Sequence, residues 1–489
     1  MNRIIMFAVI LLPIIGGSLI PILPFKTRQR MMFYIEALCV INSVLVCSML
    51  FYQPNEVFTL FRFSGDLSVT LHLDGPGKMF CALAAIMWPF AVLYSFEYMK
   101  HEEREKGFFM FYIITYGITL GVALSENILT MYFFFEMMSL VTLPLVMHTH
   151  TREAILASRT YLYFMLGGAA FAFIGMVFIL SYGTTSSFLP GGIIDMAKLD
   201  GKTDMMLLVY VFSFFGFGIK TAIFPFGRWL PKASVAPTPV TALLHAVAVV
   251  NTGAFAVMRI TYYSFGTNLL RGTWAQDVVM LFVIFTIVYG CSRAVKETHL
   301  KRRLAWSTVS NLSYILFGVV IMTPEGACGA LCHMLFHSFM KITSFFCAGA
   351  IIYKTGKNYV HELNGFGKKM PKIFCIFTVS AMALMGVPGL AGFISKWSLA
   401  RAAFASENIL AYVGVGALLV SALLTAIYML TICVRAFFPG KEFDYSTISD
   451  VKDPNMLMIV PLCVFLAFVI YFGIHPQYVL TFLSGIDFV

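Results

Sequence analysis

Residues 214–225 read FFGFGIKTAIFP, which places a lysine, Lys220, and a proline, Pro225, inside a long apolar run. Proline removes a backbone hydrogen-bond donor and clashes with the preceding turn, so the helix should break close to this lysine. A second stretch, GVPGLAGFISK, repeats the pattern with Pro388 and Lys396. The sequence therefore predicts two broken helices, each beside a lysine that apolar residues surround.

The composition of the whole chain excludes a water-soluble domain. Of the 489 residues, 59% are hydrophobic and only 12% are charged, whereas soluble chains carry roughly a quarter charged residues. Apolar runs of the length that crosses a bilayer, about 20 residues, follow one another along the chain. We expect an all-α polytopic membrane protein with about fourteen transmembrane helices, at about 3–24, 30–52, 77–99, 107–124, 127–148, 155–182, 205–227, 237–263, 275–293, 304–323, 326–353, 372–402, 407–437 and 455–482.

Positive charges predict the orientation of these helices. The connections that follow odd-numbered helices hold about 22 Lys and Arg residues, and the even-numbered connections and the termini hold about eight. Short cytoplasmic loops of membrane proteins are enriched in these residues. We therefore expect a multi-pass protein of the cell membrane with cytoplasmic odd-numbered connections and both termini outside. The net charge of +10 then reports topology, and no nucleic-acid partner is expected.

A group of ionisable residues lies inside the expected spans. A charge at bilayer depth costs at least about 2.5 kcal/mol on insertion scales, so such residues are usually functional. Arg159 belongs to this group by position, but it lies near the cytoplasmic end of its span, where a side chain that extends to the membrane surface is an equally good explanation. The stronger candidates for an ion pathway are Glu136, Lys220, His245, His333, His337, Lys341 and Lys396.

The spacing of three of these residues favours a proton relay. His333, His337 and Lys341 are four residues apart, so they share one face of a helix. Histidine changes charge near neutral pH, and a row of such groups can pass protons. A His-x3-His pair also binds metals, but no third ligand is nearby and the lysine would repel a cation. Ordinary core histidines are the remaining alternative.

Glu136 and Lys220 are predicted to act together. Each alone would tend to become neutral inside a membrane, whereas a close pair keeps both side chains charged. A proton or cation that changes their separation would then act as a switch. The alternative is a static structural ion pair.

The two broken helices lie five helices apart, which predicts two inverted five-helix repeats, spans 4–8 and 9–13. Matched broken helices in two halves are typical of transporters built in this way. Kinks also occur in membrane helices without a transport role, but two kinks that each lie beside a buried lysine favour ion handling. The expected division of the chain is a three-helix segment at 1–106, repeats at 107–263 and 264–437, and a C-terminal helix at 438–489.

The sequence predicts no cofactor or metal site in this chain. Its ten cysteines never form a Cys-x-x-Cys pair, although iron–sulfur and zinc sites need closely grouped thiolates. Neither a P-loop nor a Rossmann glycine pattern is present. Redox chemistry or ATP hydrolysis coupled to this protein would therefore take place in other chains.

Five segments resemble the antiporter-like subunits shared by respiratory complex I, energy-converting membrane-bound hydrogenases and Mrp-type Na⁺/H⁺ antiporters. They occur in the family's order between about residues 120 and 400, and they are SENILTMYFFFEMMSLVTLPLV, GIKTAIFPFGRWLPKASVAPTPVTALLHA, KRRLAWSTVSNLSYILFG, HMLFHSFMKITSFFCAGAI and GVPGLAGFISKW. The resemblance implies a fourteen-helix fold with two inverted repeats and a polar axis near mid-membrane.

The resemblance also assigns positions on this axis. It implies that Glu136 is the acid of the fifth helix, Lys220 the lysine of the broken seventh, and His245 the polar residue of the eighth. Lys341 is similarly implied to be the central lysine of the eleventh helix, and Lys396 the polar residue of the broken twelfth. Charge changes along this axis are implied to drive proton uptake on one side of the membrane and release on the other.

Subunits of this family work inside multisubunit complexes, so other membrane subunits, among them homologous antiporter-like subunits, are the expected partners. The favoured function is proton translocation in a redox-driven complex that resembles complex I or an energy-converting hydrogenase. Iron–sulfur clusters, a nickel–iron site or a flavin would then belong to partner subunits. The alternatives are an Mrp-type Na⁺/H⁺ antiporter subunit and a non-conducting membrane scaffold.

Two details bear on the ion and its entry. A sodium site needs several oxygen ligands at once, and the spans offer hydroxyl groups but few acids, which favours protons. Relatives often carry His before the tryptophan of the W-L-P motif and Asp after it, where this chain has Gly227 and Lys232. The cytoplasmic entry is therefore expected to differ, with Lys232 as a further candidate residue.

Overall fold

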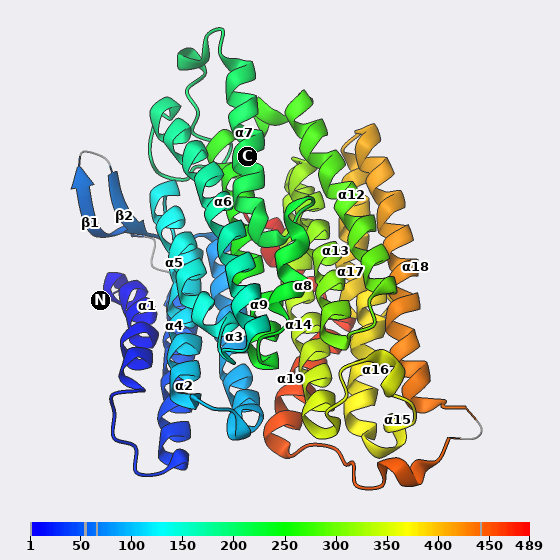
Figure 1. The fold of residues 1–489 in the computed structure, drawn as a ribbon. Helices are drawn as coiled ribbons and strands as arrows, with labels where there is room; N and C mark the ends of the chain where they lie inside the picture. Colours follow the sequence, from blue (N-terminus) through cyan, green and yellow to red (C-terminus); the bar gives the residue numbers. More distant parts are fainter. Residues whose placement is uncertain (1, 53–55, 65–66, 441–442) are drawn as a thin grey trace.

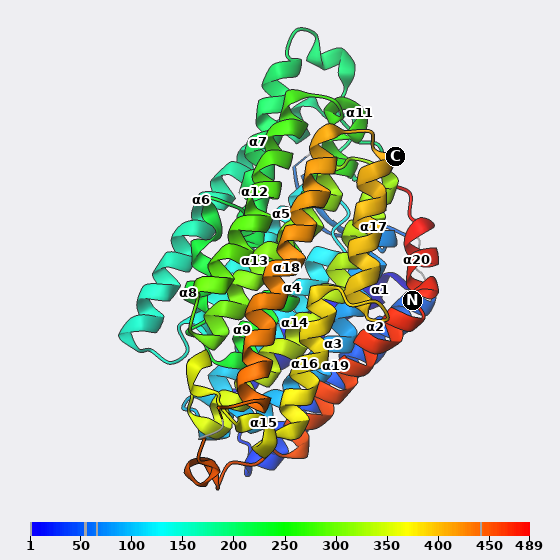
Figure 2. The same ribbon diagram turned by 90° about the vertical axis from the view of Figure 1, so that its right-hand side faces the viewer.

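The computed structural model describes residues 2–489 except 53–55, 65–66 and 441–442. It is a bundle of long helices whose axes are roughly aligned (Figures 1 and 2). Among the described residues, eleven helical segments are long and apolar enough to cross a membrane, and two shorter apolar helices cover Ile4–Leu19 and Pro371–Met385. The chain is a multi-pass integral membrane protein, as its composition predicts.

The first part of the described chain forms six helices, and local sequence fixes the start of three of them. The side chains of Asp74, Asn127 and Thr151 each accept a hydrogen bond from a backbone N–H in the first turn of the helix that follows. Such caps satisfy donors that the first turn leaves without a partner. The helices are α1 (Asn2–Leu19), α2 (Arg28–Tyr52), α3 (Gly75–Tyr98), α4 (Glu105–Ala123), α5 (Ile128–Val146) and α6 (Arg152–Tyr182).

The all-α expectation is wrong in one place. Strands β1 (Phe58–Ser64) and β2 (Leu67–Leu71) pair antiparallel between α2 and α3 and project from the bundle (Figure 1). The second strand is held by the start of α5, because Asn127 Nδ2 donates to the backbone oxygen of Ser68 (2.9 Å) and to Thr70 Oγ1 (2.6 Å). These partners are distant in sequence, so a search for helical spans leaves the segment as a connection.

Both predicted helix breaks are present. α7 (Thr203–Gly218) ends at a 3₁₀ turn, η3 (Ile219–Thr221), and the chain continues through η4 (Phe226–Arg228) into the short helix α8 (Trp229–Ala233). The second break separates α16 (Pro371–Met385) from α17 (Ala391–Ala405). It begins at Gly386, whose φ of 95° lies in the region that glycine adopts without strain.

A third break, which the sequence analysis did not predict, divides the expected span at 237–263. α9 (Thr238–Ala246) is followed by α10 (Val249–Met258) and by a π-helical turn, η5 (Arg259–Phe265). No proline lies at this junction. Asn251 Nδ2 instead donates to the backbone oxygen of Ala246, the last residue of α9 (2.9 Å). A side-chain contact therefore stabilises the interruption, and side-chain contacts do not follow from apolar periodicity.

The second part of the chain surrounds one long central helix. α14 (Pro324–Thr355) contacts α3, α9, α13, α16, α17, α19 and α20. Its residues are buried without interruption over most of its length. The expected last span at 455–482 is divided in two. The other elements are α11 (Thr267–Leu270), α12 (Trp274–Lys296), α13 (Leu300–Val320), α15 (Phe366–Lys369), α18 (Ile409–Phe437), α19 (Met456–Ile474) and α20 (Gln477–Ser484).

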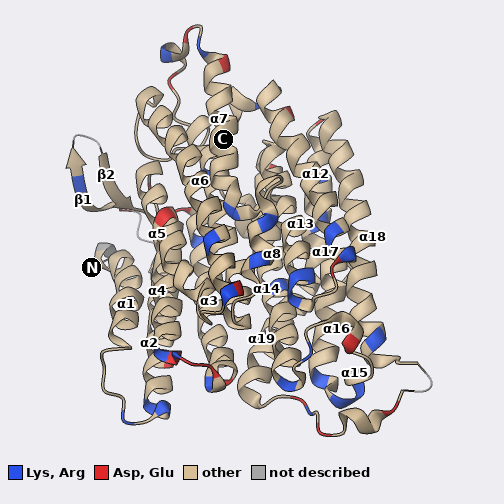
Figure 3. Ribbon diagram, viewed as in Figure 1, with Lys and Arg blue, Asp and Glu red and all other residues tan. Residues whose placement is uncertain are grey.

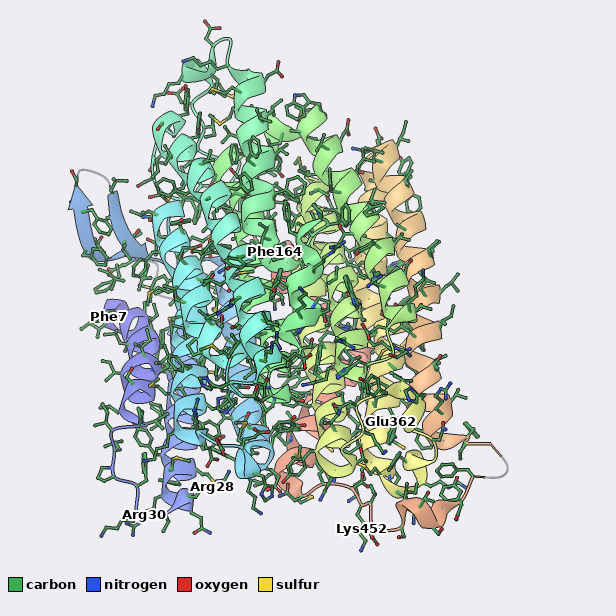
Figure 4. All side chains as sticks on the ribbon, in the orientation of Figure 1. Phe7, Arg28, Arg30, Phe164, Glu362 and Lys452 are labelled. Atoms are coloured by element: carbon green, nitrogen blue, oxygen red, sulfur yellow. The ribbon has the colours of Figure 1, made fainter. Side chains whose placement is uncertain are left out.

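Charged residues occupy two kinds of place in the bundle. Figure 3 shows Lys and Arg at the helix ends and a second group in the interior. In Figure 4, Arg28 and Arg30 lie at the same end of the bundle as Lys452. Two of the candidate lysines, Lys220 and Lys341, are buried in the interior.

Candidate functional site

Lys220 lies in the η3 turn that follows α7, and its side chain is buried. Its amine donates hydrogen bonds to the backbone oxygen of Phe135 and to Ser139 Oγ (2.8 Å), both on α5. The amine also lies 3.6 Å from the centre of the Phe135 ring, a cation–π contact. Gly253 of α10 allows this close packing, because an added Cβ would lie 2.7 Å from Lys220 Cβ. The broken helix therefore presents its lysine to the middle of α5.

Glu136 follows Phe135 on α5 and interacts electrostatically with Lys220. Its carboxylate oxygen Oε1 is buried and has no hydrogen-bond partner in the described part of the chain. Lys220 is held by a carbonyl and a hydroxyl oxygen on either side of this acid. The two residues are therefore neighbours that are not joined in a closed ion pair.

His245 lies one residue before the end of α9, and its side chain is fully buried. Its ring centre lies 4.8 Å from that of Phe345 on α14, and neither ring nitrogen has a hydrogen-bond partner among the described residues. Sequence reasoning missed Asn251, whose Nδ2 also donates to Ser338 Oγ on α14 (2.8 Å). An asparagine in the apolar run VVNTGAFAV was an available signal. The third break thus connects the first half of the chain to the central helix.

The predicted row on α14 lies in the centre of the bundle. The side chains of His333, His337 and Lys341 are all fully buried. The two imidazole ring centres are 6.0 Å apart, and His333 Nδ1 is 2.9 Å from Ser395 Oγ on α17. Within the described residues, both ring nitrogens of His337 lack hydrogen-bond partners. Buried polar atoms are usually paired, so His337 is a ring that can accept a new partner.

Lys341 contacts a chain of buried polar side chains that sequence reasoning missed. Its amine donates to Ser307 Oγ on α13 (2.6 Å), and Ser307 begins a path through α18 and α12 that returns to α13. Periodicity could not reveal this path, because its members come from three helices. We call the six residues the hydroxyl network. In order they are Ser307, Tyr428, Thr425, Cys291, Ser421 and Tyr314, with successive polar atoms 2.6, 3.1, 3.8, 2.8 and 2.6 Å apart.

Lys396 lies at the other end of the hydroxyl network. Its amine is 5.3 Å from the centre of the Tyr314 ring. The same amine donates to the backbone oxygens of Leu384 (2.6 Å) and Met385 (3.1 Å), at the end of α16. A cation is favourable there, because the last carbonyls of a helix have no helical partners and carry partial negative charge. The hydroxyl network therefore extends from Lys341 to the neighbourhood of Lys396.

A buried ion pair in the η5 turn was also missed. Both terminal nitrogens of Arg259 donate to the carboxylate of Asp74, with Nη2 2.7 Å from Oδ1. The guanidinium lies 4.8 Å from the Phe255 ring and 5.0 Å from the Tyr263 ring. Asp74 is also the cap of α3, so this contact fixes η5 to the start of that helix. Its two-point geometry indicates a structural contact.

The remaining sequence candidates lie outside the buried set. Arg159 is exposed on α6, because only one face of this helix packs against the bundle. Lys232 on α8 is exposed, as are Pro225 and Pro388 at the two predicted breaks. Among the described residues, no group of three His, Cys, Asp or Glu side chains is placed to hold a metal ion.

Comparison with known families shows to which family the chain belongs. A family model described as NADH:quinone oxidoreductase/Mrp antiporter, transmembrane region, matches residues 125–425. The chain belongs to this family. The matched region starts just before α5 and ends in α18, so it contains Glu136, the three candidate lysines and the histidines between them. The sequence resemblance is confirmed, and the chain is an antiporter-like membrane subunit.

Two relatives represent the two functional branches of the family. The chain is 26% identical over 445 residues to NAD(P)H-quinone oxidoreductase chain 4-3 of Nostoc sp., a match that covers 88% of this chain and 77% of the relative. It is 26% identical over 494 residues to Na⁺/H⁺ antiporter subunit A1 of Staphylococcus aureus, covering 96% of this chain. The chain spans 60% of the length of that subunit. Sequence similarity alone does not separate the branches.

The fold is also similar to that of a solved structure. A chain of the membrane-bound sulfane sulfur reductase, an archaeal respiratory membrane complex, superposes with a TM-score of 0.84 at 21% sequence identity. The match covers 98% of this chain and 96% of that chain. The whole antiporter-like chain, including its N-terminal helices, therefore shares one fold with that protein.

Proposed function

We propose that this antiporter-like subunit translocates protons along Glu136, Lys220, His245, His337, His333, Lys341 and Lys396, within a redox-driven membrane complex. The observation that carries the proposal is the way the lysines are held. All three amines contact carbonyl or hydroxyl oxygens, and none has a carboxylate within ion-pair distance in the described chain. A buried charge without an opposite partner is costly, so stability does not explain the buried Lys220 and Lys341.

The contacts of these residues support proton transfer. A hydroxyl group both donates and accepts hydrogen bonds, so the hydroxyl network can pass a proton from the side of Lys341 to the side of Lys396. Among the described residues, the ring nitrogens of His245 on α9 and of His337 on α14 have no hydrogen-bond partner. Like charges repel strongly where the dielectric constant is low. A proton that arrives at one lysine therefore favours release from the next.

Glu136 and Lys220 form the switch at the beginning of this path. The amine of Lys220 now contacts Phe135 and Ser139, which lie on either side of the acid in the sequence of α5. A small movement of the η3 turn exchanges these neutral partners for the carboxylate. Pairing with the acid retains the proton on the amine, and separation releases it toward His245.

The finer architecture belongs to the same proposal. Fourteen crossings result when the eleven long apolar segments are joined by α1, α13 and the α16–α17 pair. Inverted repeats at 107–263 and 264–437 give the broken α7 and the broken α16–α17 pair matching positions. The common location of Arg28, Arg30 and Lys452 (Figure 4) supports cytoplasmic odd-numbered connections and outer termini.

The relatives support a place in a larger assembly, because they are named as a chain of a quinone oxidoreductase and a subunit of an antiporter. Homologous antiporter-like subunits are the neighbours we propose, with iron–sulfur clusters, a nickel–iron site or a flavin in other chains. The second candidate function is Mrp-type Na⁺/H⁺ exchange, which the similarity to subunit A1 favours. Protons remain our first choice, because the hydroxyl network contacts the Lys341 amine, which repels sodium.

Proton uptake by vesicles that contain the native complex tests this function. Lys220→Ala and Lys341→Ala should each slow proton movement by roughly 100-fold or more, because each removes a group that carries the proton. Arg159→Ala is the matched control, since it removes a basic residue from an exposed face. Size-exclusion chromatography and the electron-transfer rate of the complex report its assembly.

The alternatives give different results in the same vesicles. Proton movement at the normal rate in both lysine variants would contradict the proposal and favour a non-conducting scaffold. Proton movement that follows an imposed sodium gradient, and that the same two variants abolish, would favour Na⁺/H⁺ exchange.

A further inference from the structure

A cleft of about 980 Å³ lies between the two halves of the chain, where α6 begins and α12 ends. The start of α6 and the η4–α8 segment contribute part of the lining, and the end of α12, the start of α13 and residues 358–359 contribute most of the rest. The cleft is separate from Lys220, Lys341 and Lys396. Five basic side chains line it: Arg228, Lys232, Arg293, Lys301 and Arg302.

Acidic residues neutralise only part of this charge. Two carboxylates, Glu153 and Glu297, lie in the same lining. Glu297 Oε1 is 3.5 Å from Arg302 Nε and also accepts hydrogen bonds from two backbone N–H groups of the following turn. Arg228 and Lys232 are exposed and have no carboxylate partner among the described residues. The cleft therefore holds three more basic than acidic side chains.

The cleft also offers a neutral polar group and aromatic surface. The Nδ1 atom of His299 is buried without a hydrogen-bond partner in the described chain. Burial and the nearby Arg302 and Lys301 lower the pKa of His299 to about 4, so its ring is neutral at pH 7 and can donate or accept one hydrogen bond. The guanidinium of Arg293 lies 5.2 Å from the Trp306 ring. Basic and aromatic side chains together are typical of the membrane interface.

The surroundings of the cleft distinguish it from a site for a free anion. On α6, Leu156, Tyr163 and Leu166 are each more than half exposed. On α12, Leu281 and Phe285 are also about half exposed. A membrane protein presents such apolar faces to acyl chains. The cleft therefore lies between two helices that face lipid. The charged side chains of the cleft lie near the ends of these helices.

We propose that this cleft binds the phosphate of an anionic phospholipid whose acyl chains lie along α6 and α12. Arginine matches phosphate through two parallel hydrogen bonds, and basic pockets between membrane helices bind anionic lipid headgroups. The lipid would connect the two halves of the subunit at one side of the membrane. The inference concerns lipid binding and does not depend on proton transfer.

Lipid retention by the purified native complex tests the proposal. The complex in neutral detergent is titrated with phosphatidylglycerol, phosphatidylcholine or inorganic phosphate, and bound lipid is measured by native mass spectrometry. Phosphatidylglycerol should be retained and phosphatidylcholine should not. Arg228→Gln with Arg293→Gln should lower this retention by roughly tenfold, because two phosphate contacts are lost. Lys368→Gln with Lys369→Gln, on α15 outside the cleft, should leave it unchanged.

A charge-preserving variant and competing ligands distinguish the possible occupants of the cleft. Arg228→Lys with Arg293→Lys preserves the charge, and it should recover part of the binding if the glutamine variant is correctly folded. Unchanged phosphatidylglycerol retention in the glutamine variant would overturn the proposal. Competition by inorganic phosphate as strong as that of the lipid would assign the cleft to a free anion. An acidic segment of another subunit found in the cleft of the intact complex would also exclude lipid.

Discussion

The two halves of this protein hold their buried lysines in different ways. In the first half, Lys220 lies within the break itself and has an acid, Glu136, as a neighbour. In the second half, Lys396 lies beyond the break and contacts the last carbonyls of α16. Lys341 contacts the hydroxyl network. Among the described residues, no carboxylate interacts with Lys341 or Lys396 as Glu136 does with Lys220.

The two halves therefore stabilise a lysine inside a membrane protein in two different ways. A lysine inside a membrane protein needs negative charge or oxygen acceptors nearby. An acid gives a strong and adjustable partner, whereas carbonyl and hydroxyl groups give weaker partners that also form a path. We infer that the first half controls the proton and that the second half conducts it. Changes that exchange these features should therefore have the largest effects.

The largest effect is expected when the second half receives an acid. Ser307→Asp places a carboxylate where Lys341 now contacts a hydroxyl group at 2.6 Å. A charge-assisted pair would hold the proton on the amine, and proton uptake by vesicles should fall by roughly 100-fold or more. Ser307→Asn is the control of similar size without charge. Equal losses in the two variants would attribute the effect to volume.

A smaller effect is expected when the first half loses its acid. Glu136→Gln keeps the size of the side chain and removes its charge, so the switch at Lys220 loses the partner that retains the proton. Proton uptake should fall by roughly tenfold or more, measured in the same vesicles. Glu136→Asp keeps the charge and should restore part of the activity. A normal rate in the glutamine variant would show that the acid has no role in control.

A still smaller effect is expected when a single member of the hydroxyl network is changed. Tyr428→Phe removes the hydroxyl group that links Ser307 to Thr425. Proton uptake should slow several-fold, and the free energy of unfolding should fall by about 1 kcal/mol. Tyr210→Phe removes a buried hydroxyl group of the first half that contacts Thr261. That control should show the loss of stability without the loss of transport.

The smallest effect concerns the cleft between the halves. His299 has a pKa of about 4 in the fold, because burial and the neighbouring Arg302 and Lys301 disfavour its charged form. Its value in an unfolded chain is about 6.5, so between these values the unfolded state binds more protons and stability falls as the pH falls. The thermal midpoint of the wild type should therefore decrease from pH 6.5 to pH 4 more steeply than that of His299→Gln. Parallel curves would contradict this.

The sequence predicted the features that depend on local composition. Apolar runs determine burial in a membrane, and the prolines at 225 and 388 remove a backbone donor wherever they lie, so both breaks followed directly. The buried positions of Lys220, Lys341 and the α14 histidines followed from their apolar neighbours. Arg159 shows the limit of this reasoning. It has similar neighbours, but only packing decides which face of α6 is covered.

The features that were missed all depend on contacts between distant segments. The third break is stabilised by Asn251, the hairpin by Asn127, and the η5 turn by the pair of Arg259 with Asp74. The hydroxyl network needs side chains of α12, α13 and α18 to meet. No periodic pattern encodes such meetings, since each partner alone resembles an ordinary polar residue in a span.

The sequence by itself therefore determined that this chain is a membrane protein of the antiporter-like family, with two broken helices and a set of buried ionisable residues. These properties follow from residue chemistry within one helix and from motifs that survive in order. Only the tertiary structure decided how each lysine is held, because the partners of an amine are chosen by the packing of several helices. The same local pattern, a lysine beside a break, was thus given an acid in one half and the last carbonyl groups of a helix in the other.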